Sequence, residues 1–169
     1  AAYSGSVPAW LAGECTLRET QIDVEALCQR ANARLILSTA STINTQERYV
    51  ALANGERVNF DMASVNIGST LTSPQQHGEN LPKLLAMRPL SSLHQRWQAL
   101  QNDISHLPSG GAQRVVGVGG GAAGCETLMS VLAQLSKQRP DIDWQGHLLS
   151  ASNALLPDAG HVPRWLMRR

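Results

Sequence analysis

The sequence is poor in the residues that mark disulfide-rich and metal-binding proteins. It has three cysteines in 169 residues, Cys15, Cys28 and Cys125, and no two of them have CxxC spacing. Three scattered cysteines are too few for a disulfide framework or a zinc site, and the spacing excludes a dithiol redox motif. The five histidines show no i, i+4 spacing of metal ligands. We therefore predict no metal site and a reducing compartment.

The sequence also has little net charge and no long apolar run. Fourteen Lys and Arg stand against thirteen Asp and Glu, a net charge of +1, which gives no basic face for nucleic acid. No apolar run approaches the roughly 20 residues that span a bilayer, and the N-terminal region lacks the pattern of a signal peptide. The first residue is Ala1, not Met, and a helical pattern stops at Arg169. These ends predict an internal piece of a longer polypeptide.

Hydrophobic residues make up 43% of the chain and charged residues 16%, enough apolar material for a core. The first half predicts a helix from an N-cap at Asp23 to Asn32, because Val24, Leu27 and Ala31 have helical spacing. Short strands are then predicted, with a two-residue hairpin turn at Asn54–Gly55. The predicted strands are 34–39, as a buried strand, 41–44, 49–52, 57–60 and 62–67.

The second half predicts alternating strands and helices. Prolines and glycine in 70–89 indicate a loop, and the spacing of Leu93, Trp97 and Leu100 predicts a helix over 90–104. A boundary follows at 108–111. After it we predict a strand at 113–118, a glycine turn at 119–124, a helix at 125–136 and a strand at 143–149, which together form a parallel βαβ unit.

The glycine turn carries the clearest functional signal. Gly119, Gly121 and Gly124 satisfy G-x-G-x-x-G directly after a predicted strand and before a predicted helix. In a dinucleotide site the first glycine permits the tight turn, the second admits a pyrophosphate, and the third lets the helix pack closely on the strand. The helix N-terminus then faces the phosphates. The alternative is a βα turn without a ligand, with Cys125 as a small residue packed beneath it.

One part of a dinucleotide site is missing from the sequence. An acidic residue is expected at the end of the second strand, where it would bind the ribose hydroxyls. That end has Ser150, Ser152 and Asn153, which offer weak hydrogen bonds to a ribose. Asp141 and Asp143 precede the strand and are expected at the opposite edge of the sheet. The choice between NAD and NADP therefore stays open at this point.

Two motifs together resemble the flavin-dependent pyridine nucleotide oxidoreductases. Residues 60–69, FDMASVNIGS, resemble the family's strand "yD-x-lvlAtGs", which touches FAD, and 116–126, VGVGGGAAGCE, resemble its second glycine fingerprint "VvGgGaaGvE". Further likeness at 3–8, 67–70 and 88–90 with Trp97 points to the type II NADH dehydrogenase-like branch. The version fused to selenide, water dikinase is the most similar.

The resemblance implies an α/β fold, namely a partial FAD/NAD(P)-binding, Rossmann-like two-domain fold with a small antiparallel β-meander. It implies a partial FAD-binding domain at 1–108 and the first part of an NAD(P)-binding domain at 109–169. Residues that it assigns to cofactor binding are Gly119, Gly120, Gly121, Ala122, Ala123, Gly124 and Glu126 for NAD(P)H, and Ile67, Gly68 and Ser69 for FAD. No side chain receives a catalytic proton-transfer role.

The implied function is a flavin-dependent NAD(P)H oxidoreductase that passes hydride from nicotinamide to FAD and on to an unknown acceptor. The implied partners are the nicotinamide dinucleotide, the rest of the polypeptide and a fused or associated selenide, water dikinase domain. The location would be cytoplasmic, with the surface of the inner membrane as an alternative. The family's first glycine fingerprint and its later Gly-Asp motif are absent from this sequence, and Ile67 replaces the usual Thr. This chain alone is therefore expected to be inactive and to lack FAD. The alternative function is a nucleotide-binding or regulatory module without redox activity.

Overall fold

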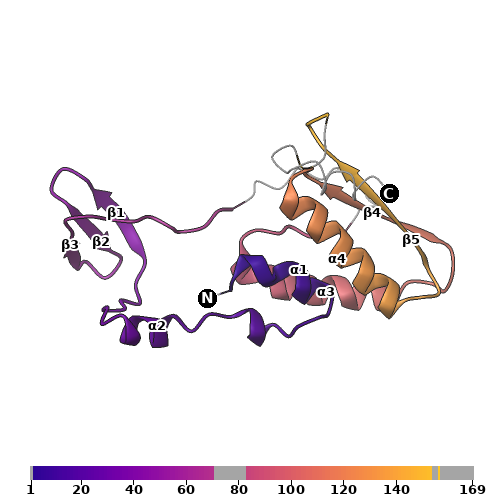
Figure 1. Cartoon of the computed structure of the whole chain (residues 1–169), viewed down its shortest axis with the longest axis horizontal. Helices are drawn as coiled ribbons and strands as arrows, with labels where there is room; N and C mark the ends of the chain where they lie inside the picture. Colours follow the sequence, from indigo (N-terminus) through magenta and orange to yellow (C-terminus); the bar gives the residue numbers. More distant parts are fainter. Residues whose placement is uncertain (1, 71–82, 154–155, 157–169) are drawn as a thin grey trace. The chain divides into compact units, whose positions relative to one another are not determined.

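The computed structural model describes residues 2–70, 83–153 and 156 (Figure 1). Their contacts divide the chain into two compact units, Ala1–Ile22 with Leu71–Arg169, and Asp23–Thr70. We call these the helical unit and the meander unit, and each is described by itself. The predicted domain boundary at 108–109 concerns a larger fold and stays a prediction.

The helical unit contains a parallel βαβ motif. β4 (Ala112–Val118) pairs in parallel with β5 (Asp143–Leu149), from Ala112 opposite Asp143 to Val118 opposite Leu149. The connection is α4 (Ala122–Gln138), which lies along this sheet in Figure 1. The predicted βαβ unit is confirmed. One boundary was wrong, because the helix begins at Ala122 and not at Cys125, so the glycine turn is only three residues long.

The core of the helical unit lies among its helices. α1 (Val7–Leu11) packs against α4, and α3 (Leu93–Ser105) contributes the predicted apolar face. Short 3-10 turns at Ser4–Ser6, Arg18–Thr20 and Leu90–Ser92 complete the unit. Each apolar side chain that is fully buried stabilises the fold by about 1.5–3 kcal/mol. The buried cluster consists of Val7, Leu11, Leu93, Trp97, Ile104, Val131 and Leu135.

Two long side chains fasten segments to this core. Lys137 Nζ donates to the carbonyl oxygen of Ala12 at 3.1 Å, which ties the end of α1 to α4. Arg96 donates to the carbonyl oxygens of Ala86 and Pro89, both at 2.8 Å, and so holds the segment that leads into α3. The segment after α1 and the segment before α3 are therefore fixed although they lack regular structure.

The meander unit begins with α2 (Val24–Arg30), whose N-terminus is capped as predicted. The Asp23 carboxylate accepts from the backbone N–H of Ala26 at 2.9 Å. Three antiparallel strands follow in the order β1 (Ala40–Asn44), β2 (Tyr49–Leu52) and β3 (Arg57–Asn59). The predicted strands at 41–44, 49–52 and 57–60 are therefore confirmed. The Arg57 guanidinium lies 4.4 Å from the centre of the Tyr49 ring, a cation–π contact across β2 and β3.

The hairpin between β2 and β3 differs from the predicted two-residue turn. Gly55 N donates to Leu52 O at 3.0 Å, and only Gly55 has a positive φ, +87°. Leu52 N donates to Glu56 O at 2.9 Å, so three residues form the loop. This is a type I turn followed by a left-handed glycine. The Asn54 side-chain oxygen accepts a hydrogen bond from Glu56 N. Asn54 does not adopt the positive φ that the predicted two-residue turn requires.

Two strand predictions were wrong. Residues 34–39 and 62–67 form no regular structure, and apart from the half-buried Ile36 their large apolar side chains are exposed: Leu37 is 90% exposed, Met62 91% and Ile67 88%. A strand needs a neighbour for its backbone N–H and C=O groups, and apart from the hydrogen bond from Ala53 N to Thr39 O, next to β1, no described segment pairs with either stretch. Apolar composition alone therefore did not make these segments strands.

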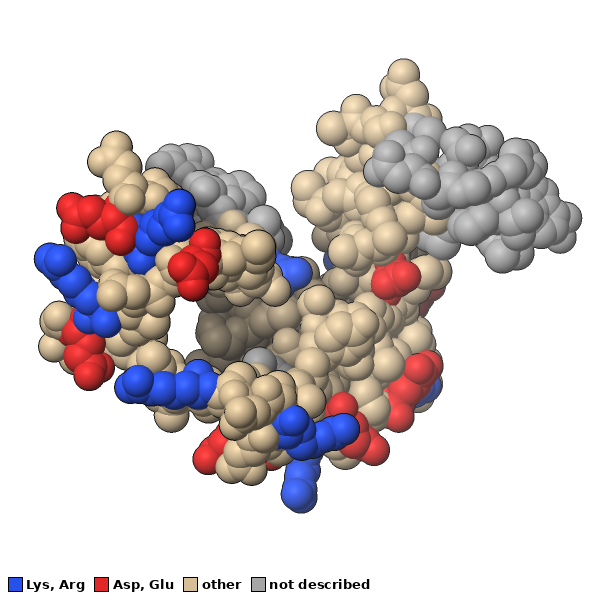
Figure 2. All heavy atoms as spheres, turned by 60° about the vertical axis from the view of Figure 1, so that its left-hand side comes forward, with Lys and Arg blue, Asp and Glu red and all other residues tan. Residues whose placement is uncertain are grey.

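Within the described residues no helix is long and apolar enough to span a membrane. The surface charge is mixed. Lys and Arg side chains alternate with Asp and Glu across the face shown in Figure 2, and no large patch of one sign is visible there. This distribution agrees with the nearly balanced formal charge of +1.

Candidate functional site

The candidate site is the turn between β4 and α4. Gly119 follows the strand with φ +127°, a conformation that L side chains rarely adopt. Gly121 is the N-cap of α4, with φ −79° and ψ 176°. The chain thus reverses from strand to helix within three residues, because glycine permits the conformation at the first of them.

The three motif glycines have three different surroundings. A Cβ on Gly124 would overlap the carbonyl oxygen of Gly119, so this helical position has no room for a side chain. A Cβ on Gly121 would meet no atom of the described residues within 4 Å. The first and third glycines are therefore required by the fold itself. Among the described residues, the second glycine leaves open space in front of the helix N-terminus.

The N-terminus of α4 points its backbone N–H groups at this space. No side chain of a described residue caps it, and the first N–H groups of a helix have no partner within the helix. The helix dipole places partial positive charge at this end. Cys125 lies beneath the turn, 2% exposed, with its Sγ 3.8 Å from Gly120 O. Glu126 is exposed one residue further along α4. An anionic group is the ligand that suits this arrangement.

The end of β5 is joined to the glycine turn. Gly119 N donates to Leu149 O at 2.8 Å, and Leu156 N donates to Gly120 O at 2.9 Å. A Cβ on Gly120 would overlap the side chain of Ser150. The middle glycine of Gly119–Gly120–Gly121 is therefore required because Ser150 occupies the space of its side chain. The glycine fingerprint gives no signal for this contact, which sequence reasoning missed.

The residues predicted to contact FAD lie in the meander unit. Ile67, Gly68 and Ser69 are exposed and form no regular structure, and Gly68 has φ +77°. The structure thus brings Gly119–Gly124 and Glu126 together on one turn and helix. Residues 67–69 belong to the other unit, the meander unit.

The two carboxylates weighed as ribose ligands lie at the start of β5, as predicted. Arg139 holds Asp141 with two hydrogen bonds, Nε to Oδ1 at 2.8 Å and Nη2 to Oδ2 at 2.7 Å. These hydrogen bonds keep the pKa of Asp141 well below its ordinary value and raise that of Arg139. Asp143 accepts from Gln145 Nε2 at 2.7 Å. Both carboxylates therefore belong to the far end of the sheet.

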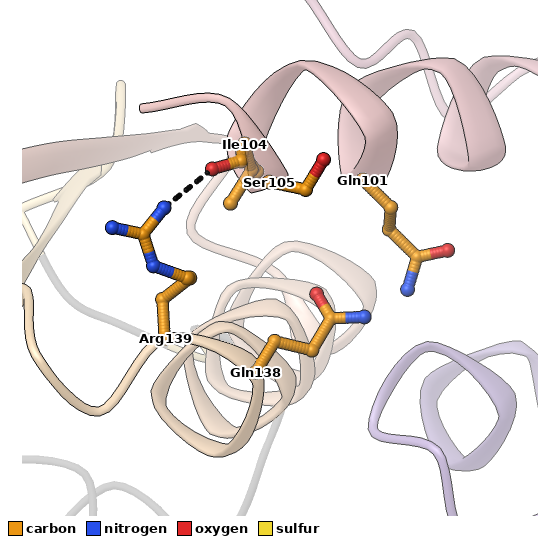
Figure 3. A pocket seen from close by; sticks show the side chains of 5 residues that line it. All are labelled: Gln101, Ile104, Ser105, Gln138 and Arg139. Atoms are coloured by element: carbon orange, nitrogen blue, oxygen red, sulfur yellow. Dashed lines mark hydrogen bonds between the residues drawn. The ribbon is translucent and has the colours of Figure 1, made fainter. Parts of the chain in front are cut away.

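A shallow hollow of about 240 Å³ lies at the C-terminal ends of α3 and α4 (Figure 3). Gln101, Ile104, Ser105, Gln138 and Arg139 line it. Arg139 also donates to the carbonyl oxygens of Ile104 and Leu107 at 3.0 Å and of Pro108 at 3.3 Å, so its five N–H groups are used. At 1.5 Å per residue, α4 separates this hollow from the glycine turn by about 25 Å. Arg139 thus joins two helix ends and has no N–H left for a ligand.

No protein-family model matches the chain, and no curated protein sequence matches it. Solved structures do match. A chain of the covalent putidaredoxin reductase–putidaredoxin complex aligns over 99% of this chain with TM-score 0.57 and 18% identity. NADH:rubredoxin oxidoreductase from Clostridium acetobutylicum aligns over 92% with TM-score 0.55 and 14% identity. Reduced Bacillus anthracis CoADR-RHD aligns over 97% with TM-score 0.63 and 15% identity.

These similarities concern part of each solved chain. The chain spans 38%, 36% and 28% of the three proteins, in the order given. At this level of identity the comparison shows the fold. The predicted fold class is confirmed: the chain is α/β and has a partial Rossmann-like fold with a small antiparallel meander.

Proposed function

We propose that the chain is part of a flavin-dependent NAD(P)H oxidoreductase that passes hydride from nicotinamide to FAD and on to an acceptor. The observation that carries the proposal is the β4–turn–α4–β5 unit. Its three motif glycines have the three properties that a dinucleotide site requires: a positive φ, open space and close packing. The likeness to a solved NADH:rubredoxin oxidoreductase supports it.

The glycine turn fits a pyrophosphate. The space in front of Gly121, which a Cβ would enter, admits phosphate oxygens to the backbone N–H groups of α4. In this proposal residues 119–124 orient the nicotinamide dinucleotide and Glu126 lies on the nicotinamide side. The hydride chemistry itself belongs to the cofactors.

The finer parts of the proposal rest on the sequence resemblance. Ile67, Gly68 and Ser69 would contact the flavin, and the branch would be the type II NADH dehydrogenase-like one. A selenide, water dikinase domain, fused or associated, would be the partner. Positive φ at Gly68 and exposure of all three residues agree with an approach of the backbone to a ligand.

The pyrophosphate role is tested by Gly121→Val. Valine tolerates the extended conformation at this N-cap and has room, so the fold is expected to persist. Its side chain would stand between phosphate and backbone, and the dissociation constant for NADH should rise at least about tenfold, or 1.4 kcal/mol. Isothermal titration measures this. Ala133→Val, on an exposed position of the same helix, is the matched control. Unchanged affinity in folded Gly121→Val would leave the turn as a packing feature only.

The redox part needs a separate measurement. The full-length protein of which we propose this chain to be part, purified from the cells that make it, should carry flavin absorbance, and NADH should bleach that absorbance without oxygen. Binding of NADH by a full-length protein that carries no flavin would favour the alternative, a nucleotide-binding module without redox activity. Absence of NADH binding would contradict both functions.

A further inference from the structure

The stretch between α3 and β4 has the composition of a hinge. Residues 108–111, PSGG, are the boundary that the sequence marks, and Gly110 and Gly111 both have a positive φ, +78° and +81°. A Cβ on either glycine would meet no atom of the described residues within 4 Å. Glycine permits large changes of φ and ψ, so these two residues by themselves would let the βαβ unit turn against α3.

One side chain holds this stretch on the side of α3. The Arg139 guanidinium, directly after α4, donates to the carbonyl oxygens of Ile104 and Leu107 at 3.0 Å and of Pro108 at 3.3 Å (Figure 3 draws the first of these bonds). The last carbonyls of a helix have no partner within it, and the helix dipole places partial negative charge at this end. Arg139 thus caps the C-terminus of α3 from the C-terminus of another helix.

The side that leads into β4 is held as well. Asp143 N, at the start of β5, donates to Gly111 O at 2.9 Å. Arg139 binds both carboxylate oxygens of Asp141, at 2.8 and 2.7 Å, and these hydrogen bonds, with a smaller contribution from the backbone N–H of Gly110, lower the pKa of Asp141. The Arg139 side chain is only 15% exposed. Both glycines are therefore tied to the segment that begins β5.

We propose that Arg139 is a clasp that locks the junction between α3 and the βαβ unit, so that these elements move as one rigid body. The clasp does not depend on what the glycine turn at the other end of α4 binds. Gly110 and Gly111 then form a fixed turn and not a swivel. Any rotation of the glycine turn against other parts of the protein takes place outside residues 93–149.

Nuclear magnetic resonance of the whole chain, labelled with 15N, tests the clasp. Order parameters of the amides at 109–111 report motion of the junction, and residual dipolar couplings report the orientation of α3 and of the βαβ unit. We expect order parameters of about 0.85, as in rigid backbone, and a single alignment tensor for all four elements. Order parameters below about 0.6 in the unaltered chain, or a separate tensor for α3, would overturn the clasp.

The first variant removes the guanidinium. Arg139→Gln should lower the order parameters at 109–111 below about 0.6 and give α3 a tensor of its own. Lys137→Gln, two positions earlier, is the matched control. It also removes a positive charge from the end of α4, but that charge binds the carbonyl oxygen of Ala12, so 109–111 should stay rigid. Unchanged order parameters in folded Arg139→Gln would show that the junction is rigid without Arg139.

A second variant separates the shape of the side chain from its charge. Arg139→Lys keeps a positive charge near the end of α3, but lysine has three donors on one atom where arginine has five on a planar group. It cannot bind Asp141 and the carbonyl groups at once, so the junction should be released as in Arg139→Gln. A rigid junction in Arg139→Lys would show that charge alone holds it, and the clasp would be wrong.

Discussion

The helical unit and the meander unit are stabilised in different ways. In the helical unit, α1, α3 and α4 bury a cluster of apolar side chains, and Leu11 is completely buried. In the meander unit, Leu52 is the one described apolar residue that counts as buried, while Leu35, Leu37, Met62, Val65 and Ile67 are exposed. The meander is held by strand pairing and by local contacts such as the Arg57–Tyr49 pair.

The contrast shows what an apolar run needs in order to become a strand. Residues 113–118 and 143–149 pair because α4 returns the chain to the same sheet and covers one face. Residues 34–39 and 62–67 have similar composition but belong to no sheet among the described residues, although Thr39 O, next to β1, accepts from Ala53 N. Strand formation in this chain therefore follows the availability of a neighbour more than the local sequence.

The largest effect is expected from Leu93→Ala in the helical unit. Leu93 is 2% exposed in the core, and truncation of such a leucine costs about 2–5 kcal/mol because it removes burial and leaves a cavity. Denaturant unfolding gives the free energy. Hydrogen exchange should quicken in α3 and α4 while β1–β3 keep their protection. Equal loss of protection in both units would show that they unfold as one.

The next effect concerns the link between Arg139 and Asp141. Because hydrogen bonds from Arg139 lower the pKa of Asp141 in the folded chain, this pair stabilises the fold above the ordinary carboxyl pKa of 3.8 and loses its effect as pH falls below that value. Asp141→Asn should therefore lower the melting temperature at neutral pH, and the difference from the unaltered chain should shrink below about pH 4. Asp143→Asn, whose carboxylate contacts the neutral Gln145, is the control and should change less. A difference that is constant with pH would exclude the ion pair as its cause.

The smallest effect is expected from Leu37→Ala, which removes the same side-chain atoms as Leu93→Ala but at an exposed position. Leu37 is 90% exposed, and surface substitutions of this kind change stability by less than about 0.5 kcal/mol. The measurement is the same denaturant unfolding. A loss above about 1 kcal/mol would mean that Leu37 is covered in solution, and the contrast between the two units would then disappear.

Most of the local structure was predictable from the sequence. The Asp23 cap, the three short strands of the meander, the face of α3 and the parallel βαβ unit follow from side-chain spacing and turn residues. The turn at Gly119, Gly121 and Gly124 was predictable because the spacing of these glycines reflects the backbone conformation, the open space or the close packing that each position requires. These features depend on residues that are close in the sequence.

The features that the sequence did not predict depend on residues that are distant in it. Ser150 is thirty positions from Gly120, and nothing in the glycine fingerprint signals that its side chain fills the space beside the middle glycine. Arg139 reaches back to carbonyl groups at 104–108, where no sequence pattern marks an acceptor. The exposure of 34–39 and 62–67 likewise depends on which strands are present to pair with them.

The hydrogen bond from Lys137 to Ala12 joins residues 125 positions apart. Val7 and Leu11 therefore leave the ribosome long before Val131 and Leu135, the core residues of α4 against which α1 packs. At 5–20 residues per second, the interval is roughly 6–25 s. During that time only the α3 part of this core, where the Trp10 ring lies 5.9 Å from the His94 ring, can be made available to α1. The helical unit thus cannot complete its core during synthesis until most of α4 has been made.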